Sequence, residues 1–252
     1  MVSPRMVNGT ILLQPVSPTT FKNLQRHPQY YIQGGDLHIL VGNTLFRVHS
    51  YFFDRESQVF KDLLAVPPSG GSRQGSEDSS AIVLETTRED FESFLFIFYN
   101  PQFTVYEFSL QDWTAVLDQA HRWGFQSIKD LSIRELQTLD ISDVQRVSLY
   151  EQYDVKKEIL VPLYSNLCIR PEALSIEEAE ILGMATAVRI FQGRERINAR
   201  AAKKGPPSPE DLQRFVKSML GLCPSKKPDP DTNPESKTEL SKVETNGSGK
   251  AA

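Results

Sequence analysis

The chain has 252 residues, with 28 basic and 32 acidic side chains, so its formal net charge is −4. Hydrophobic residues make up 39% of the sequence, which is enough for the cores of one or two domains. A mildly acidic chain lacks the basic face that neutralises phosphates, so we expect no direct nucleic-acid partner. Its two cysteines are too few for a disulfide scaffold or a four-cysteine zinc module, and we expect no cofactor.

No stretch approaches the roughly 18–20 uncharged apolar residues of a membrane span, and the first residues lack the longer apolar run of a signal peptide. We therefore expect a cytoplasmic or nuclear protein that does not contact a membrane. Residues 203–252 hold seven of the 16 prolines and one aromatic residue. A segment this poor in apolar surface is expected to be mostly disordered.

Short strands and helices are predicted in the first half of the chain. Two β-rich runs surround Gly42 and Asn43, both of which tolerate positive φ, so we expect a tight hairpin. Two short helices, at 49–53 and 57–64, and a strand at 81–84 follow from the apolar spacing. The glycines and serines between them predict a flexible loop at 67–80.

The second half of the chain has a helical pattern. Thr87 with Asp90 and Ser109 are typical N-cap residues, and Gly124 is typical of a helix end. Ser175 with Glu178 forms a capping box, which predicts one long helix that continues through Phe191 into a basic end. Apolar spacing predicts helices at 128–138, 144–153 and 159–167 between them.

A second amphipathic pattern lies inside the proline-rich tail. Ser208 and Pro209 form a good helix start, and apolar residues follow at helical spacing. We expect a helix at 209–220 that docks on a groove, either of this chain's own core or of a partner; a pattern that stays unfolded is the alternative. The candidate contact residues are Leu212, Phe215, Val216, Met219 and Leu220.

The order of these elements carries a recognisable set of motifs. Asp36 opens the first strand of the hairpin, Phe46, Val48 and His49 close the second in a Phe-x-Val-His pattern, and Phe60 lies in a Ser-x-x-Phe helix. This ordered set resembles a BTB/POZ domain. The segments 98–101 and 123–125, Phe-Tyr-Asn-Pro and Trp-Gly-Phe, are similar to those in BTB proteins of mushroom-forming fungi.

The resemblance covers about residues 33–200 and implies an α+β fold. In this BTB/POZ fold, a sheet made of a short β-hairpin and a strand packs on helices, and an all-α helical extension and a disordered C-terminal tail follow. The expected parts are an N-terminal extension (1–32), the BTB/POZ domain (33–125), the helical extension (126–202) and the tail (203–252).

The resemblance also implies a non-enzymatic protein–protein interaction module that forms a homodimer through its BTB domain. Two alternatives stay open: a substrate adaptor of a cullin-type ubiquitin ligase, and a transcription cofactor that acts through a DNA-binding partner. No catalytic, metal or cofactor residue is predicted, because the histidines lack ligand spacing and Cys168 has no partner motif. For Asp36 and His49 we expect fold-stabilising hydrogen bonds rather than acid–base chemistry.

Overall fold

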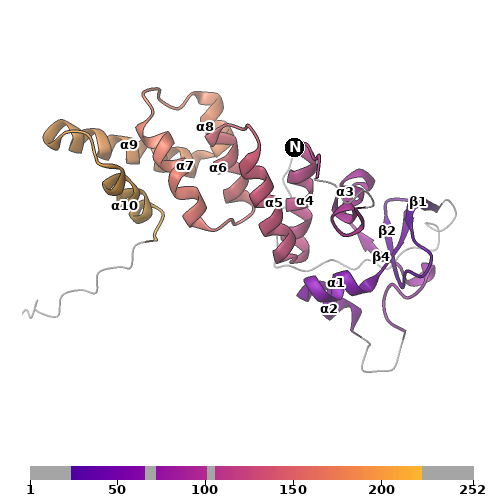
Figure 1. The fold of residues 1–252 in the computed structure, drawn as a ribbon. Helices are drawn as coiled ribbons and strands as arrows, with labels where there is room; N and C mark the ends of the chain where they lie inside the picture. Colours follow the sequence, from indigo (N-terminus) through magenta and orange to yellow (C-terminus); the bar gives the residue numbers. More distant parts are fainter. Residues whose placement is uncertain (1–23, 66–71, 101–105, 223–252) are drawn as a thin grey trace, which may run out of the picture.

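The computed structural model describes residues 24–65, 72–100 and 106–222. Figure 1 shows an elongated molecule, with a small sheet at one end and the last helices at the other. The strands are β1 (Gln25–Tyr31), β2 (Leu37–Val41), β3 (Thr44–Val48) and β4 (Ile82–Leu84). The helices are α1 (Ser50–Glu56), α2 (Gln58–Leu64), the 3-10 helix η2 (Asp78–Ser80), α3 (Arg88–Tyr99), α4 (Leu110–Trp123), α5 (Gln126–Thr138), α6 (Asp143–Gln152), α7 (Lys157–Ile169), α8 (Ile176–Leu182), α9 (Met184–Lys204) and α10 (Pro209–Met219). The predicted α+β fold with a helical extension is confirmed.

The sheet has the strand order β1-β3-β2-β4. Strands β2 and β3 form the predicted antiparallel hairpin, with Val41 opposite Thr44 and a positive φ of 58° at Gly42. Strand β4 pairs with β2 in parallel, with Ile39 opposite Ile82. All five residues of β2 are buried, because both faces of this inner strand are covered.

Strand β1 was not predicted, since residues 1–32 were expected to form a separate N-terminal extension. The structure places β1 at the edge of the sheet, parallel to β3, with Gln25 opposite Thr44. Pro28 lies in the middle of this strand and cannot donate a backbone hydrogen bond, which an edge strand tolerates. The pairing is irregular between Arg26 and Tyr31. Because of this break, β1 lacks the regular alternation of apolar and polar residues by which a strand is recognised in a sequence.

The segment expected as a flexible loop at 67–80 is described from residue 72 onward, and this part packs against the sheet. The N–H of His38 in β2 donates to the carbonyl oxygen of Gly75 at 2.7 Å, and Gly75 N–H donates to the carbonyl of Ser80 at 2.7 Å. A Cβ on Gly75 would come within 2.7 Å of Leu37 Cδ1, and φ at Gly75 is +71°. The backbone therefore approaches β2 closely at a position that favours glycine.

An aromatic core joins the sheet to the helices α1 to α4. Phe94 of α3 and Trp123 of α4 meet edge to face with ring centroids 5.1 Å apart. Phe125, just after α4, packs on Phe94 at 5.0 Å and on Phe60 of α2 at 5.7 Å. All four side chains are at most 4% exposed. Edge-to-face contacts of this kind add to the free energy of apolar burial.

The predicted helix caps are confirmed. The Thr87 hydroxyl accepts from the N–H of Asp90, and Ser109 and Asp112 form a reciprocal capping box at the start of α4. Gly124 ends α4 in the left-handed conformation, with φ 72°. These side chains satisfy backbone groups that the helix itself leaves unpaired.

The prediction of a single long helix from Ser175 to beyond Phe191 is wrong, because this segment forms two helices. The capping box of Ser175 and Glu178 begins α8 as expected, but Gly183 ends that helix with φ 76° and ψ 156°. Helix α9 then starts at Met184. Glycine reaches this backbone conformation without steric cost, so it separates two segments that share helical apolar spacing.

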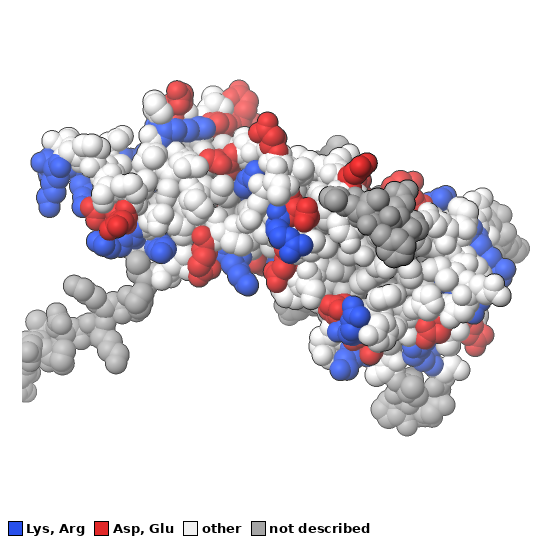
Figure 2. All heavy atoms as spheres, in the orientation of Figure 1, with Lys and Arg blue, Asp and Glu red and all other residues white. Residues whose placement is uncertain are grey.

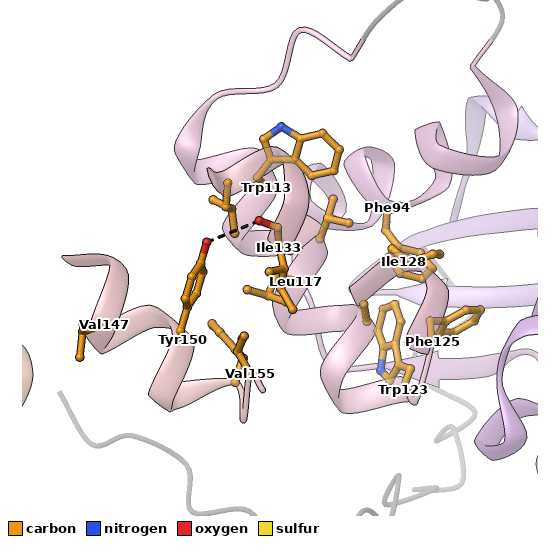
Figure 3. Packing of buried hydrophobic residues seen from close by; sticks show 14 of the residues in the cluster. Phe94, Trp113, Leu117, Trp123, Phe125, Ile128, Ile133, Val147, Tyr150 and Val155 are labelled. Carbon is orange, nitrogen blue, oxygen red and sulfur yellow. Dashed lines mark hydrogen bonds between the residues drawn. The ribbon is translucent and has the colours of Figure 1, made fainter. Parts of the chain in front are cut away.

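The helical extension is continuous with the core of the first domain. Figure 3 shows Tyr150 of α6 beside Ile133 of α5, and the Tyr150 hydroxyl donates to the Ile133 carbonyl at 3.4 Å. In addition, the guanidinium of Arg146 donates to backbone carbonyls of the segment that ends α5. Packing and hydrogen bonds therefore join α6 to α5 as one body.

The expectation that residues 203–252 are mostly disordered is corrected for residues 203–222. Helix α9 continues to Lys204, and α10 forms where the amphipathic pattern predicts it, with Ser208 accepting from the N–H of Asp211. Helix α10 packs on α7 and α9. The apolar residues of α10 are gathered on one face of the helix, so they can be buried against a neighbour. The average composition of the tail does not reveal this local pattern. The rest of the tail lies outside the described residues.

Candidate protein-interaction surfaces

Asp36, the first residue of the resemblance motif, caps helix α1 from a distance. Its Oδ1 accepts from Ser50 N–H at 2.8 Å, and its Oδ2 accepts from the Ser50 hydroxyl at 2.6 Å. Arg73 donates to Oδ2 at 3.1 Å. Burial alone would raise the pKa of Asp36, but the hydrogen bonds from Ser50 and Arg73 outweigh it and hold the pKa below its usual value. Asp36 is therefore ionised, and its carboxylate holds the start of α1 in place.

The other motif residues lie in the core or next to it. Phe46, Val48 and Phe60 have no exposed surface. The backbone N–H of His49 donates to the Tyr99 hydroxyl at 2.9 Å, and His49 Nδ1 lies 3.1 Å from the same oxygen. The motif thus positions α1 between the sheet and α3, and none of its residues forms part of a catalytic arrangement in the described structure.

Helix α1 presents an aromatic and cationic surface, which we call the α1 face (Tyr51, Phe52 and Arg55). Tyr51 is 61% exposed, and the Arg55 guanidinium lies 5.1 Å from its ring centroid. Arg55 Nη1 also donates to the Tyr51 hydroxyl at 3.3 Å. Phe52 stacks on Phe98 of α3 at 5.1 Å, which anchors the surface to the core. Tyrosine and arginine are enriched where proteins bind one another.

Sequence reasoning missed the α1 face. Its residues follow His49 directly, inside a segment that reads only as a short helix. The available signal was the position of Tyr51 beside Phe52 and Phe53 in one helical turn, because three consecutive aromatic residues cannot all face the core. Phe53 is fully buried, so its neighbour Tyr51 points outward.

The candidate contact residues of the tail helix are used within the chain itself. Leu212, Val216 and Leu220 are at most 8% exposed, and Phe215 and Met219 pack beside them. The Lys157 ammonium of α7 donates to the Leu220 carbonyl at 3.2 Å, which ties the end of α10 to α7. Of the two docking surfaces considered for this helix, the structure shows this chain's own core.

A cavity of about 500 Å³ lies between α5 and the start of α7. Lys129 contributes to its wall, with its ammonium 3.2 Å from His121 Nδ1 and from the Asp154 carbonyl oxygen. Burial lowers the pKa of Lys129, and burial together with the Lys129 charge lowers that of His121. The described lining residues include no serine, cysteine or histidine. The wall therefore offers charged and amide groups for binding.

Metal sites and membrane-spanning helices are both absent from the described parts of the chain. Residues 24–65, 72–100 and 106–222 hold no group of three His, Cys, Asp or Glu side chains placed to bind a metal ion. Within the same ranges, no helix combines the length and the apolar character needed to cross a bilayer.

Comparison with known proteins assigns the first part of the chain. Residues 23–139 match the BTB/POZ domain family. This match begins before the expected boundary at residue 33 and so includes β1, and it continues past residue 125 through α5. The comparison with curated proteins found no match. The chain therefore contains a BTB/POZ domain, which is a protein–protein interaction module. The similarity to fungal BTB proteins stays a prediction.

Proposed function

We propose that this protein is a non-enzymatic interaction protein that forms a homodimer through the α1 face of its BTB domain. The observation that carries the proposal is the exposed stack of Tyr51 and Arg55 on a helix whose start is capped by Asp36. Within the described part of the BTB match, the most exposed large apolar residues are Tyr51, at 61%, and Leu110, at 37%.

Preorganisation supports this choice of surface. Phe52 and the Asp36 cap hold α1 in place, so little conformational entropy is lost when a second copy packs against Tyr51. A rigid aromatic ring beside a guanidinium buries apolar area and offers polar contacts at the same time. An α1 face that packs on its own copy would give a two-fold symmetric dimer, in which each contact occurs twice.

Substitution of Tyr51 tests the proposal. Sedimentation of the full chain at low micromolar concentration is expected to show self-association, and Tyr51→Glu should weaken it at least tenfold, because a carboxylate would have to be desolvated in the interface. Leu110→Glu, at the exposed first turn of α4, is the matched control and should leave the mass unchanged. Equal association of the wild type and Tyr51→Glu would refute the α1 face as the dimer surface.

A second candidate function is a substrate adaptor of a cullin-type ubiquitin ligase. It is favoured by the helices α6 to α9, which pack on one another directly after the BTB match, where the resemblance expects such an extension. Arg146 and Tyr150 of α6 join this extension to α5 by hydrogen bonds. Purified cullin mixed with the full chain should then co-elute with it on gel filtration. Separate elution at concentrations well above micromolar would dismiss this function.

A further inference from the structure

The far end of the molecule carries an apolar surface that the BTB domain does not explain. Three side chains of α9 are strongly exposed: Met184 at 80%, Val188 at 41% and Phe191 at 44%. Ile181, the next-to-last residue of α8, is 48% exposed. We call these four residues the α9 stripe. Met184, Val188 and Phe191 follow the i, i+4, i+7 spacing that places side chains on one face of a helix.

The α9 stripe lies on the face of α9 that points away from the core. The opposite face packs inward through Ala187, Ile190 and Ile197, which are at most 8% exposed. Helix α9 is therefore apolar on two faces, one of which the chain's own core covers with α7 and α10. An exposed group of large apolar side chains marks an interaction surface more often than a solvated one.

The charges at the two ends of the stripe have opposite signs. Glu177 and Glu180 are exposed on α8, before the stripe. After it, α9 exposes one acid, Glu195, and four bases, so this end has a net positive charge; the bases are Arg196, Arg200, Lys203 and Lys204. Figure 2 shows acidic side chains over α8 and basic side chains at the end of α9 furthest from α8. A second copy laid antiparallel along the stripe would bring each acidic end against a basic end, whereas a parallel copy would oppose like charges.

We propose that the α9 stripe is a homotypic interface, in which α9 of one chain packs antiparallel on α9 of a second copy. The two-fold axis lies between Val188 and Phe191, so the apolar side chains of both copies interdigitate at the centre. The acidic residues of each α8 face the basic end of the other α9. Gly183 makes this surface possible, because the break at its φ of 76° sets the acidic α8 apart from the apolar start of α9.

This interface is independent of the α1 face but has a consequence when both exist. Figure 1 places α1 and α9 at different ends of an elongated molecule. Two separate two-fold interfaces on one chain generate an assembly larger than a dimer, which is closed and dihedral when the two axes intersect and an open array otherwise. Four large apolar residues per copy form a small interface, so the α9 contact is expected to be weak and to appear as the concentration rises.

The first test disrupts the α1 face, so that a failure of the α9 proposal can be distinguished from a failure of the α1 proposal. In the full chain with Tyr51→Glu, sedimentation at high concentration should still show a reversible dimer, and Val188→Glu with Phe191→Glu should weaken it at least tenfold. Gln213→Glu with Ser218→Glu, which adds two carboxylates at exposed positions of α10 outside the stripe, is the matched control. A Tyr51→Glu chain that remains monomeric at every concentration would overturn the α9 interface. If Tyr51→Glu has no effect but the stripe variant abolishes association, the α1 proposal fails and the α9 proposal stands.

The second test examines the antiparallel arrangement by charge exchange, again with Tyr51→Glu in every chain. One variant carries E177K and E180K, and the other carries R196E and K203E. Each variant alone should associate at least tenfold more weakly, because like charges then meet at both ends. An equimolar mixture should restore the dimer, since opposite charges again face each other at both contacts. Thermal unfolding of each variant shows that it is folded. A mixture of folded variants that stays monomeric would contradict the antiparallel interface.

Discussion

Gly193 of α9 lies so close to α10 that a Cβ on it would come within 3.0 Å of the Sδ atom of Met219. The same Cβ would lie 3.0 Å from the Sγ atom of Cys168 in α7. Glycine inside a helix lowers the stability of the helix by about 0.5–1 kcal/mol relative to alanine. At Gly193 the close packing of α7, α9 and α10 offsets this loss. Helix α10 is thus a packed element of the fold, although it follows a proline-containing turn.

Substitution of Gly193 should therefore detach α10. Gly193→Val is expected to lower the free energy of unfolding by about 1–3 kcal/mol, because the added methyl groups overfill the contact. Amide hydrogen exchange of residues 209–219 should accelerate, while that of β2 and β3 stays protected. Ala199→Val, at an exposed position of the same helix, is the control. Equal stability and equal exchange in the two variants would contradict this account of the contact.

The thiol of Cys168 should be unreactive in the folded chain. Cys168 is 2% exposed, and burial raises the pKa of its thiol to about 11, although the nearby Arg194 charge lowers it in part. The thiolate, which is the nucleophile, is therefore scarce at pH 8. Mass spectrometry of the peptide that contains Cys168 should show little alkylation by iodoacetamide in the native chain and complete alkylation in concentrated urea. Gly193→Val should increase native labelling, and rapid labelling of the wild type would show that the site is open.

The Asp36 cap should make stability depend on pH. The folded-state pKa of Asp36 lies below its unfolded value of about 3.9, so the carboxylate stabilises the fold above that pH and loses this effect as the pH falls through the folded pKa. Asp36→Ala should cost about 1 kcal/mol at pH 7, which is typical of a lost helix cap. Urea unfolding should give a smaller difference from wild type at pH 3 than at pH 7. Asp54→Ala on the same helix is the control, and a difference that does not change with pH would argue against the cap.

Arg146 should contribute to the stability of both parts of the molecule. Its guanidinium donates to the carbonyls of Leu136 at 2.6 Å and of Leu139 at 2.9 Å, across the junction between α5 and α6. Arg146→Met keeps the apolar stem but removes hydrogen bonds that are each worth about 1.5–3 kcal/mol when one partner is charged. Thermal unfolding should remain one transition at a lower temperature. Arg134→Met, at an exposed position, should change little, and two separate transitions in the wild type would contradict a shared core.

Local chemistry explains which parts of the fold could be predicted from the sequence. A cap such as Thr87 or Ser109 and a hairpin turn such as Gly42-Asn43 act on neighbouring residues, so their effect is visible in the sequence itself. Strand β1 depends on pairing with a distant partner, β3, and its proline hides it. The break at Gly183 was missed because a single glycine inside an apolar spacing is also tolerated within a helix.

The candidate surfaces were harder to predict because exposure is a property of the assembled fold. The spacing of Leu212 and Val216 predicted an amphipathic helix correctly, but only the packing of α10 on α7 and α9 shows what it contacts. Conversely, Val188 and Phe191 look like core residues in sequence, and they are exposed because Ile190 already occupies the inner face of α9. Apolar spacing identifies a face, and the tertiary structure decides whether that face is covered.

The most direct measurement is the molar mass of the full chain carrying Val188→Glu and Phe191→Glu, determined by sedimentation equilibrium over a range of micromolar concentrations. These substitutions remove the α9 contact, so any remaining self-association comes from elsewhere in the chain. The account predicts a mass of two chains, which falls to one chain when Tyr51→Glu is added. A mass of one chain at every concentration before that addition would contradict the central claim that the BTB domain forms a homodimer through its α1 face.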